Sequence, residues 1–473
     1  MVGLITEILR KLLLAICTVA FSAYLVPALL TFGESQFQSL VVFSFYIYCI
    51  ISLFTYSRHK LFYVLSLPVL TQFIHIFQKY SFTTGANSGW RLLPFIILDV
   101  YFIDFFVWNK TFFSQKNRLF IFSWIIINSF FLLISPNLER IIGGGIILYL
   151  LSLPLFFIYF NQTTLAHDFR VEIEKYLCLI FIILGLGTFG LVLVSAGYKG
   201  SDNLLVTRNI ADTNVTMAYF ILLWPFVLLY SLRNKVSHLF KMGMLTIFLG
   251  TVALSFSRGA VLIVIPYVLV SALCTKGFIS FKWIVPVIFL VLINRSTLGG
   301  LIENHDLAYF WKLRFGDLNS FSSLLTKLES ISGRAEIHQL AYSLFLKSPI
   351  IGHGTQSFEI LGPGYREAHS LWFTLLAEQG IIGVVYYYGI FLALLLFLAK
   401  STLKDSRKNV LLLISFLFYL LFNHTVGSVF VILPGNSITI NCIAPVILLC
   451  LYFYPERGEK LVSGPEMSNR FHP

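Results

Sequence analysis

Uncharged apolar runs of membrane-spanning length recur along this chain and constrain its fold more than any other feature. Residues 177–194, for example, carry no charged side chain, and a helix needs about 20 predominantly apolar residues to cross a bilayer. Hydrophobic residues make up 57% of the 473 residues and charged residues only 12%, which is more apolar surface than a soluble core can bury. We therefore expect an all-α, polytopic membrane protein with about 12 to 14 transmembrane helices.

The alternation of apolar runs and polar breaks divides the chain into four parts. Residues 1–294 should hold about eleven transmembrane helices, residues 295–379 a periplasmic loop with interfacial helices, residues 380–455 about three further transmembrane helices, and residues 456–473 a cytoplasmic tail. The expected spans lie near residues 12–31, 38–56, 60–78, 90–108, 118–135, 141–160, 176–196, 213–232, 240–256, 259–275, 282–294, 380–399, 409–424 and 436–454.

The distribution of basic residues predicts the orientation. Lysine and arginine favour cytoplasmic loops, and most of those in the short loops fall inside only if the N-terminus is cytoplasmic. The loop at 295–379 then faces outward. The net charge of +12 is scattered between apolar runs, so it indicates membrane orientation and no nucleic-acid partner. The six cysteines all lie in expected spans without CxxC spacing, which favours buried apolar side chains over a disulfide or a metal site.

Three arginines on the expected outer side stand apart from this pattern. Arg258 lies in Ser257-Arg258-Gly259, the only place where the long apolar run 243–274 can turn, and either an anion or lipid phosphate could pair with it. Arg208 precedes Asn214 at the start of a span and on its own is more typical of a surface residue. Arg334 follows Ser332-Gly333 and should lie in the first turn of an amphipathic interfacial helix that stops before Pro349.

Histidine supplies the remaining candidate chemistry in the expected loop at residues 295–379. After a turn at Gly352-His353-Gly354, expected to be flexible, His369 stands at the entrance of the next apolar helix. It could be a surface residue, a metal ligand or a general base. The spacing of His338, His353 and His369 is not that of a compact metal site, whereas a neutral imidazole can take a proton from a hydroxyl. Because guanidinium groups bind phosphate oxygens, the set favours transfer from a diphosphate.

In these motifs the chain resembles the O-antigen ligase and O-antigen polymerase superfamily of bacterial envelope glycosyltransferases. The resemblance covers about residues 205–400. Its motifs are Ser257-Arg258-Gly259-Ala260, Ser332-Gly333-Arg334, the run from Lys347 to Gly354 (KSPIIGHG), His369-Ser370-Leu371, and the run from Glu378 to Gly383 (EQGIIG).

The resemblance implies transfer of a glycan from undecaprenyl diphosphate to an acceptor hydroxyl at the periplasmic face of the bacterial inner membrane. It places Arg258 and Arg334 on the diphosphate and His369 on the acceptor, with inversion at the anomeric carbon and without a metal or other cofactor. Arg208, Asn214, His338 and Ser370 are the expected substrate-binding residues. The chain departs from the family pattern at two of these, with Ser370 where asparagine is common and His338 where an aromatic residue is frequent.

Two alternatives stay open at this stage. The acceptor could be lipid A core, as for a ligase, or a second lipid-linked glycan, as for a polymerase. A transporter or flippase of an anionic or lipid-linked substrate would also place arginines on the outer side. However, the chain shows no internal repeat, and its polar residues gather toward one face. Transfer chemistry is therefore the preferred interpretation.

Overall fold

A computed structural model of the chain describes residues 2–30, 36–77, 93–108, 115–139, 146–163, 169–194, 213–254, 258–275, 334–362, 364, 367–403, 406–426 and 443–455. These residues form α-helices and, within the described ranges, no β-strand, which confirms the all-α expectation. The helices are α1 (Val2–Leu30), α2 (Gln36–Thr55), α3 (Lys60–Phe77), α4 (Leu93–Trp108), α5 (Gln115–Leu133), α7 (Ile146–Thr163), α8 (Phe169–Val194), α9 (Thr213–Arg233), α10 (His238–Leu254), α11 (Arg258–Cys274), α16 (Arg334–Lys347), α17 (Ser357–Leu361), α18 (Leu371–Thr402), α19 (Ser406–Thr425) and α20 (Ile443–Phe453).

Most expected spans coincide with helices. The helix predicted at 213–232 is α9, that at 259–275 is α11, and that at 409–424 lies within α19. The expected span at 282–294 lies outside the described residues. Among the described helices, two are long and apolar enough to cross a membrane, at Leu371–Thr402 and Arg407–Thr425. The architecture is consistent with an all-α membrane protein, and the number of spans and their sidedness remain predictions.

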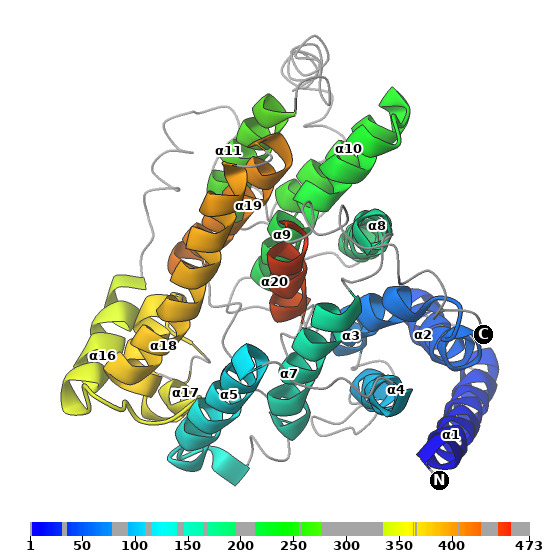
Figure 1. Cartoon of the computed structure of the whole chain (residues 1–473), viewed down its shortest axis with the longest axis horizontal. Coiled ribbons are helices and arrows are strands. Elements are labelled where there is room, and N and C mark those ends of the chain that lie inside the picture. Colours follow the sequence, from blue (N-terminus) through cyan, green and yellow to red (C-terminus); the bar gives the residue numbers. More distant parts are fainter. Residues whose placement is uncertain are drawn as a thin grey trace.

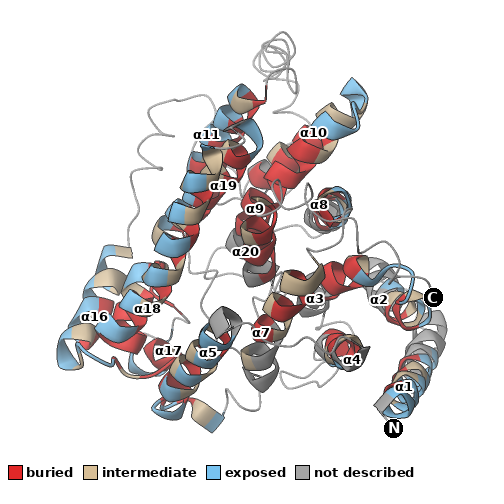
Figure 2. Cartoon of the chain, in the orientation of Figure 1, coloured by how far each residue is buried: buried red, intermediate tan, exposed pale blue. Residues whose placement is uncertain are grey.

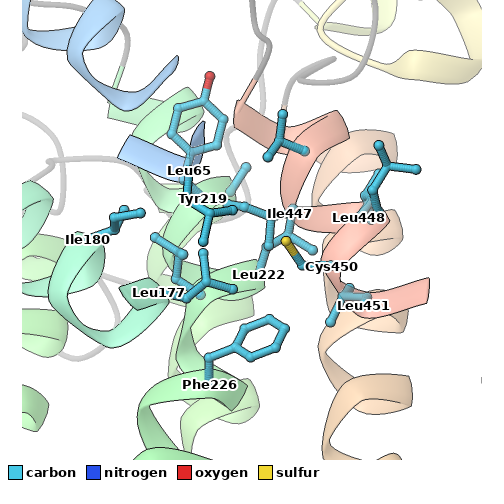
Figure 3. Close-up of a cluster of buried hydrophobic side chains, with 14 of the residues drawn as sticks. Leu65, Leu177, Ile180, Tyr219, Leu222, Phe226, Ile447, Leu448, Cys450 and Leu451 are labelled. Carbon is cyan, nitrogen blue, oxygen red and sulfur yellow. The ribbon is translucent and has the colours of Figure 1, made fainter. Parts of the chain in front are cut away.

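Helix α9 lies at the centre of the packed core. Every residue from Met217 to Leu229 other than Pro225 is a buried hydrophobic one, and a helix that is apolar on all sides is stable only when neighbours surround it. Helices α8, α10, α11, α19 and α20 all contact it, and Figure 2 shows most of its described length as buried. In Figure 3, Tyr219, Leu222 and Phe226 of α9 lie among apolar side chains of α3, α8 and α20.

A row of four packed helices connects the sequence motifs. Helix α11 packs on α19, α19 on α18, and α18 on α16 (Figure 1). Arg258 is the first residue of α11 and Arg334 the first residue of α16. Two motifs that are far apart in the sequence are therefore carried by the first and the last helix of this row.

Helix α18 is broken at Gly380, and the turn after α16 fills the break. Gly380 has φ of 60°, a backbone conformation that favours glycine. The N–H groups of His353 and Gly354 donate to the carbonyls of Ala377 and Glu378, which end the first half of the helix. Across the break, the N–H groups that begin the second half donate to the turn, Ile381 to Pro349 at 2.9 Å and Ile382 to Ile350 at 3.2 Å.

The expected flexible turn at Gly352-His353-Gly354 is thus held on both sides. A Cβ on Gly352 would lie 2.4 Å from the carbonyl carbon of Glu378, and one on Gly380 would lie 2.5 Å from the carbonyl oxygen of Ile350. Both distances are shorter than a carbon side chain can accept. The expectation of flexibility was wrong because the two backbones pack directly against each other and exchange hydrogen bonds.

Candidate active site

Arg334 begins α16 and reaches the C-terminal end of α19. The predicted helix from Arg334 to the residue before Ser348-Pro349 is confirmed, since α16 spans Arg334–Lys347. The Arg334 guanidinium donates to the backbone carbonyls of Thr425 and Val426, the latter at 3.5 Å. The last carbonyls of a helix lack intrahelical partners and carry partial negative charge. They therefore hold the guanidinium at this helix end.

The first turn of α11 meets the same end of α19. Helix α10 ends at Leu254 and α11 begins at Arg258, which places the helix start within the expected Ser-Arg-Gly segment. A Cβ on Gly259 would lie 2.6 Å from Cγ2 of Val426, so the side chain of Val426 occupies the space that a larger residue at position 259 would need. The residue after Arg258 and the guanidinium of Arg334 thus both contact Val426.

This convergence has an electrostatic consequence. The N-terminus of a helix presents unpaired N–H groups and the positive end of its dipole, so it favours anions. Helices α11 and α16 both begin with arginine; the first turn of α11 lies against Val426, and the side chain of Arg334 reaches the carbonyl of Val426. Only the backbone of Arg258 is described here, and it places the residue at the start of α11.

His338 lies one helical turn after Arg334, on the side of α16 that faces α18. Its ring stacks on Phe373, with centroids 4.3 Å apart and ring planes 15° from parallel. Burial lowers the pKa of His338 below its ordinary value, and the positive charge of Arg334 and the nearby imidazole of His369 lower it further, against a hydrogen bond with the backbone of Ala368 that raises it. His338 is therefore a neutral imidazole near pH 7, positioned within the electrostatic reach of both predicted catalytic groups.

His369 occupies a strained position at the entrance of α18. Its φ is 53°, in the left-handed region that few non-glycine residues adopt and that is often found at functional sites. Its Nδ1 lies 3.7 Å from Oε1 of Glu367, whose side chain is buried while that of His369 is partly exposed. This is ion-pair distance, longer than a hydrogen bond. At this distance the carboxylate of Glu367 can stabilise a positive charge on the imidazole electrostatically.

Ser370 is the N-cap residue of α18, with extended backbone and no hydrogen bond from its side chain to the helix end. It is buried, and its carbonyl accepts hydrogen bonds from the backbone N–H and the hydroxyl of Thr374. The Thr374 hydroxyl in turn accepts from the N–H of Ala368. Ser370 thus belongs to the network that fixes the loop carrying His369.

The structure groups some of the predicted site residues and does not describe others. Arg334, His338, His369 and Ser370 lie on α16 and at the start of α18, and the start of α11 adjoins Val426. Arg208 lies outside the described residues. Asn214 lies in the first turn of α9, with its side chain outside the description. Within the described ranges, no three His, Cys, Asp or Glu side chains form a group that could hold a metal ion.

Sequence reasoning did not identify Glu367 as part of the site. An acid two positions before a histidine, in Glu367-Ala368-His369, is the only signal that could have found it. The carbonyls of Thr425 and Val426 had no sequence signal, because any residue supplies a backbone carbonyl. Only the packing of α19 on α11, together with the hydrogen bonds from Arg334, reveals their role.

Comparison with known proteins finds a similarity in this part of the chain. The model of a family described as O-antigen ligase matches residues 242–388, a segment that contains Arg258, Arg334, His338, His369 and Ser370. The match confirms the resemblance to the O-antigen ligase and polymerase superfamily. Neither a curated protein nor a solved structure matches the chain.

Proposed function

We propose, from the family match and the site geometry, that the chain is a membrane glycosyltransferase that moves a glycan from undecaprenyl diphosphate to an acceptor hydroxyl. The family match supports an O-antigen ligase or polymerase type of function in general. The observation that carries the proposal is that the first turn of α11 and the guanidinium of Arg334 meet at Val426, with His338 close enough to both Arg334 and His369 to feel their charge.

The arginines would hold the diphosphate of the donor. A guanidinium binds phosphate oxygens through two parallel charge-assisted hydrogen bonds, which are stronger than bonds to neutral carbonyls. A diphosphate could therefore replace Thr425 and Val426 as the partner of Arg334. The starts of α11 and α16 add N–H groups and favourable dipoles. As the glycosidic bond breaks, these groups stabilise the negative charge that develops on the leaving diphosphate.

His369 would activate the acceptor. The acceptor hydroxyl gives its proton to Nε2 of His369 while its oxygen forms a bond to the anomeric carbon. The bond between that carbon and the diphosphate oxygen breaks, and its electron pair leaves with undecaprenyl diphosphate. The imidazolium that forms is stabilised by Glu367, whose Oε1 lies 3.7 Å from Nδ1 of His369. The proton then passes to solvent, so atoms and charges balance.

A single displacement of this kind inverts the configuration of the anomeric carbon, because the acceptor attacks opposite the leaving group. Undecaprenyl diphosphate leaves readily once its charge is held by arginine, and the proposal therefore includes no metal or other cofactor. The site would face the periplasm, with the chain in the bacterial inner membrane as a multi-pass protein. The acceptor is either lipid A core or a second lipid-linked glycan.

Transport is the second candidate, and one observation favours it. Helix α18 is interrupted at Gly380, and interrupted helices line substrate sites in many transporters. A flippase of a lipid-linked glycan would also hold a diphosphate with arginine. It would form no new glycosidic bond, which distinguishes the two functions.

Reconstitution tests the proposal. The purified protein is placed in liposomes with an undecaprenyl-diphosphate-linked repeat unit, with and without lipid A core, and the products are separated by chain length. Longer chains without core identify a polymerase, and transfer only in the presence of core identifies a ligase. Movement of the repeat unit across the bilayer without any new bond would refute glycosyl transfer and support the flippase.

A further inference from the structure

The turn between α16 and α17, residues Ser348–Thr355, exposes apolar side chains and carries no formal charge. Ile350 is 63% exposed, and Ile351 and Leu346 at the end of α16 are also exposed. From residue 348 to residue 358 the sequence has no Lys, Arg, Asp or Glu. Single exposed apolar residues are common on proteins, but an uncharged turn with adjacent exposed isoleucines is unusual in water.

This turn adjoins the second half of α18. The N–H groups of Ile381 and Ile382 donate to the carbonyls of Pro349 and Ile350, so the two segments lie side by side. Ile381 also begins a stripe of exposed apolar side chains, which recur at helical spacing along one face of α18. The stripe consists of Ile381, Val385, Leu392 and Leu396.

The length of this half-helix places the turn at the edge of a bilayer. Residues 381–402 are 22 residues, which at about 1.5 Å per residue gives about 33 Å. The hydrocarbon core of a bilayer is about 30 Å thick. If this half of α18, which carries its one formal charge on Lys400 in the last turn, spans the core, then Gly380 and the Ser348–Thr355 turn lie where the core ends.

Much of the backbone of the turn is hydrogen-bonded within the protein. Irregular backbone at membrane depth is stable only where its polar groups find partners within the protein. The N–H groups of four consecutive residues, Gly352 to Thr355, all donate to carbonyls of the protein. Gly352 donates to Ser348, His353 to Ala377, Gly354 to Glu378 and Thr355 to Phe131. The His353 ring nitrogen Nε2 also lies 2.9 Å from the carbonyl of Leu344.

We propose that the Ser348–Thr355 turn is inserted into the edge of the hydrocarbon core and that Ile350 and Ile351 contact lipid acyl chains. Lys347, exposed at the end of α16, would reach the phosphate groups of the same lipids through its long side chain. Part of the expected periplasmic loop at 295–379 would then lie in lipid. The inference concerns membrane placement and does not depend on glycosyl transfer.

Nitroxide labels on the full-length protein in lipid nanodiscs test this placement. In a background whose six cysteines are replaced by alanine, Ile350→Cys is labelled, and collision with oxygen is compared with collision with a water-soluble nickel chelate. Val385→Cys on the exposed stripe of α18 serves as the lipid control. Glu336→Cys, exposed in the first turn of α16, serves as the water control. Ile351→Cys repeats the measurement if the first variant does not fold.

The proposal predicts that the oxygen-to-nickel accessibility ratio at residue 350 matches that at residue 385 and exceeds that at residue 336. A ratio equal to that at residue 336 would place the turn in water and overturn the proposal. Low collision with both reagents would show that protein covers the turn, whether a second copy or another partner, and would also overturn it.

Discussion

Arg334 donates a hydrogen bond to the carbonyl of Val426 at 3.5 Å and thereby ties the first turn of α16 to the last turn of α19. On its other side, Val426 packs against Gly259, next to Arg258. The two arginines of the proposed diphosphate site are thus positioned relative to the same residue, Val426, at the end of α19. A site of this kind is positioned before its substrate arrives, which reduces the reorganisation that the reaction requires.

Replacing Arg334 tests the role of the guanidinium. Arg334→Ala should lower the rate of glycan transfer by about 10²–10³-fold, the effect of losing one well-placed group that stabilises developing negative charge. Arg334→Lys should recover only part of it, because lysine keeps the charge but loses the paired donors. Lys347→Ala, at the other end of α16, is the matched control. Equal rates for Arg334→Ala and Lys347→Ala would contradict the assignment.

Glu367→Gln should lower the turnover rate and leave donor binding unchanged. The amide keeps the size of the side chain but removes the negative charge beside Nδ1 of His369, and this charge is proposed to act only once the imidazolium forms. Single-turnover kinetics and equilibrium binding of the lipid-linked donor separate the two effects. A variant with weakened donor binding and normal turnover would assign Glu367 to the donor side instead.

The local part of this site could be predicted from sequence, and the long-range part could not. The bounds of α16 follow from an apolar repeat and from Pro349, which are both local signals. The packing of Gly352 and Gly380 was missed, because their contacts join backbone atoms of segments almost 30 residues apart and backbone atoms leave no pattern in side chains. Glu367 was missed because its role depends on the turn of chain that brings its carboxylate back to His369.

The lowered pKa of His338 predicts a specific dependence of stability on pH. Since folding lowers this pKa below the ordinary 6.5, the unfolded chain takes up a proton that the folded protein resists. The contribution of His338 to the pH dependence of the free energy of unfolding is absent well above pH 6.5. It becomes destabilising as the pH falls through 6.5 and stops growing below the lowered pKa.

Comparison of wild type with His338→Gln isolates this effect, because other titrating groups cancel in the difference. Thermal unfolding in detergent should show wild type losing more stability than the variant between neutral pH and mildly acidic pH. In an Arg334→Gln background the difference should shrink, since one cause of the lowered pKa is removed. Parallel curves for wild type and His338→Gln would rule out the lowered pKa.

The break in α18 predicts that replacement by alanine destabilises the protein at one glycine of this helix and not at another. Gly380→Ala should cost about 1–3 kcal/mol, because its φ of 60° and ψ of −159° lie in a region that essentially only glycine adopts, and its Cβ would also meet the carbonyl of Ile350. Gly389→Ala should cost nothing, since no atom lies within 4 Å of the added Cβ. Thermal unfolding of both variants checks this. Similar melting temperatures would mean that α18 is continuous.

Metal independence is a separate prediction of the proposed chemistry. Because arginine takes the charge of the leaving diphosphate, transfer by purified protein should persist in EDTA at its full rate. The same assay with added magnesium provides the comparison. Loss of transfer in EDTA and its return with a divalent cation would require a metal in the mechanism.

The most direct measurement of the central proposal follows undecaprenyl diphosphate during a reaction of the purified, reconstituted protein. Wild type should release one undecaprenyl diphosphate for each new glycosidic bond, and His369→Ala should form neither product while still binding the donor. Retention of transfer by His369→Ala, or movement of donor by wild type without bond formation, would contradict the proposal that this site catalyses glycan transfer.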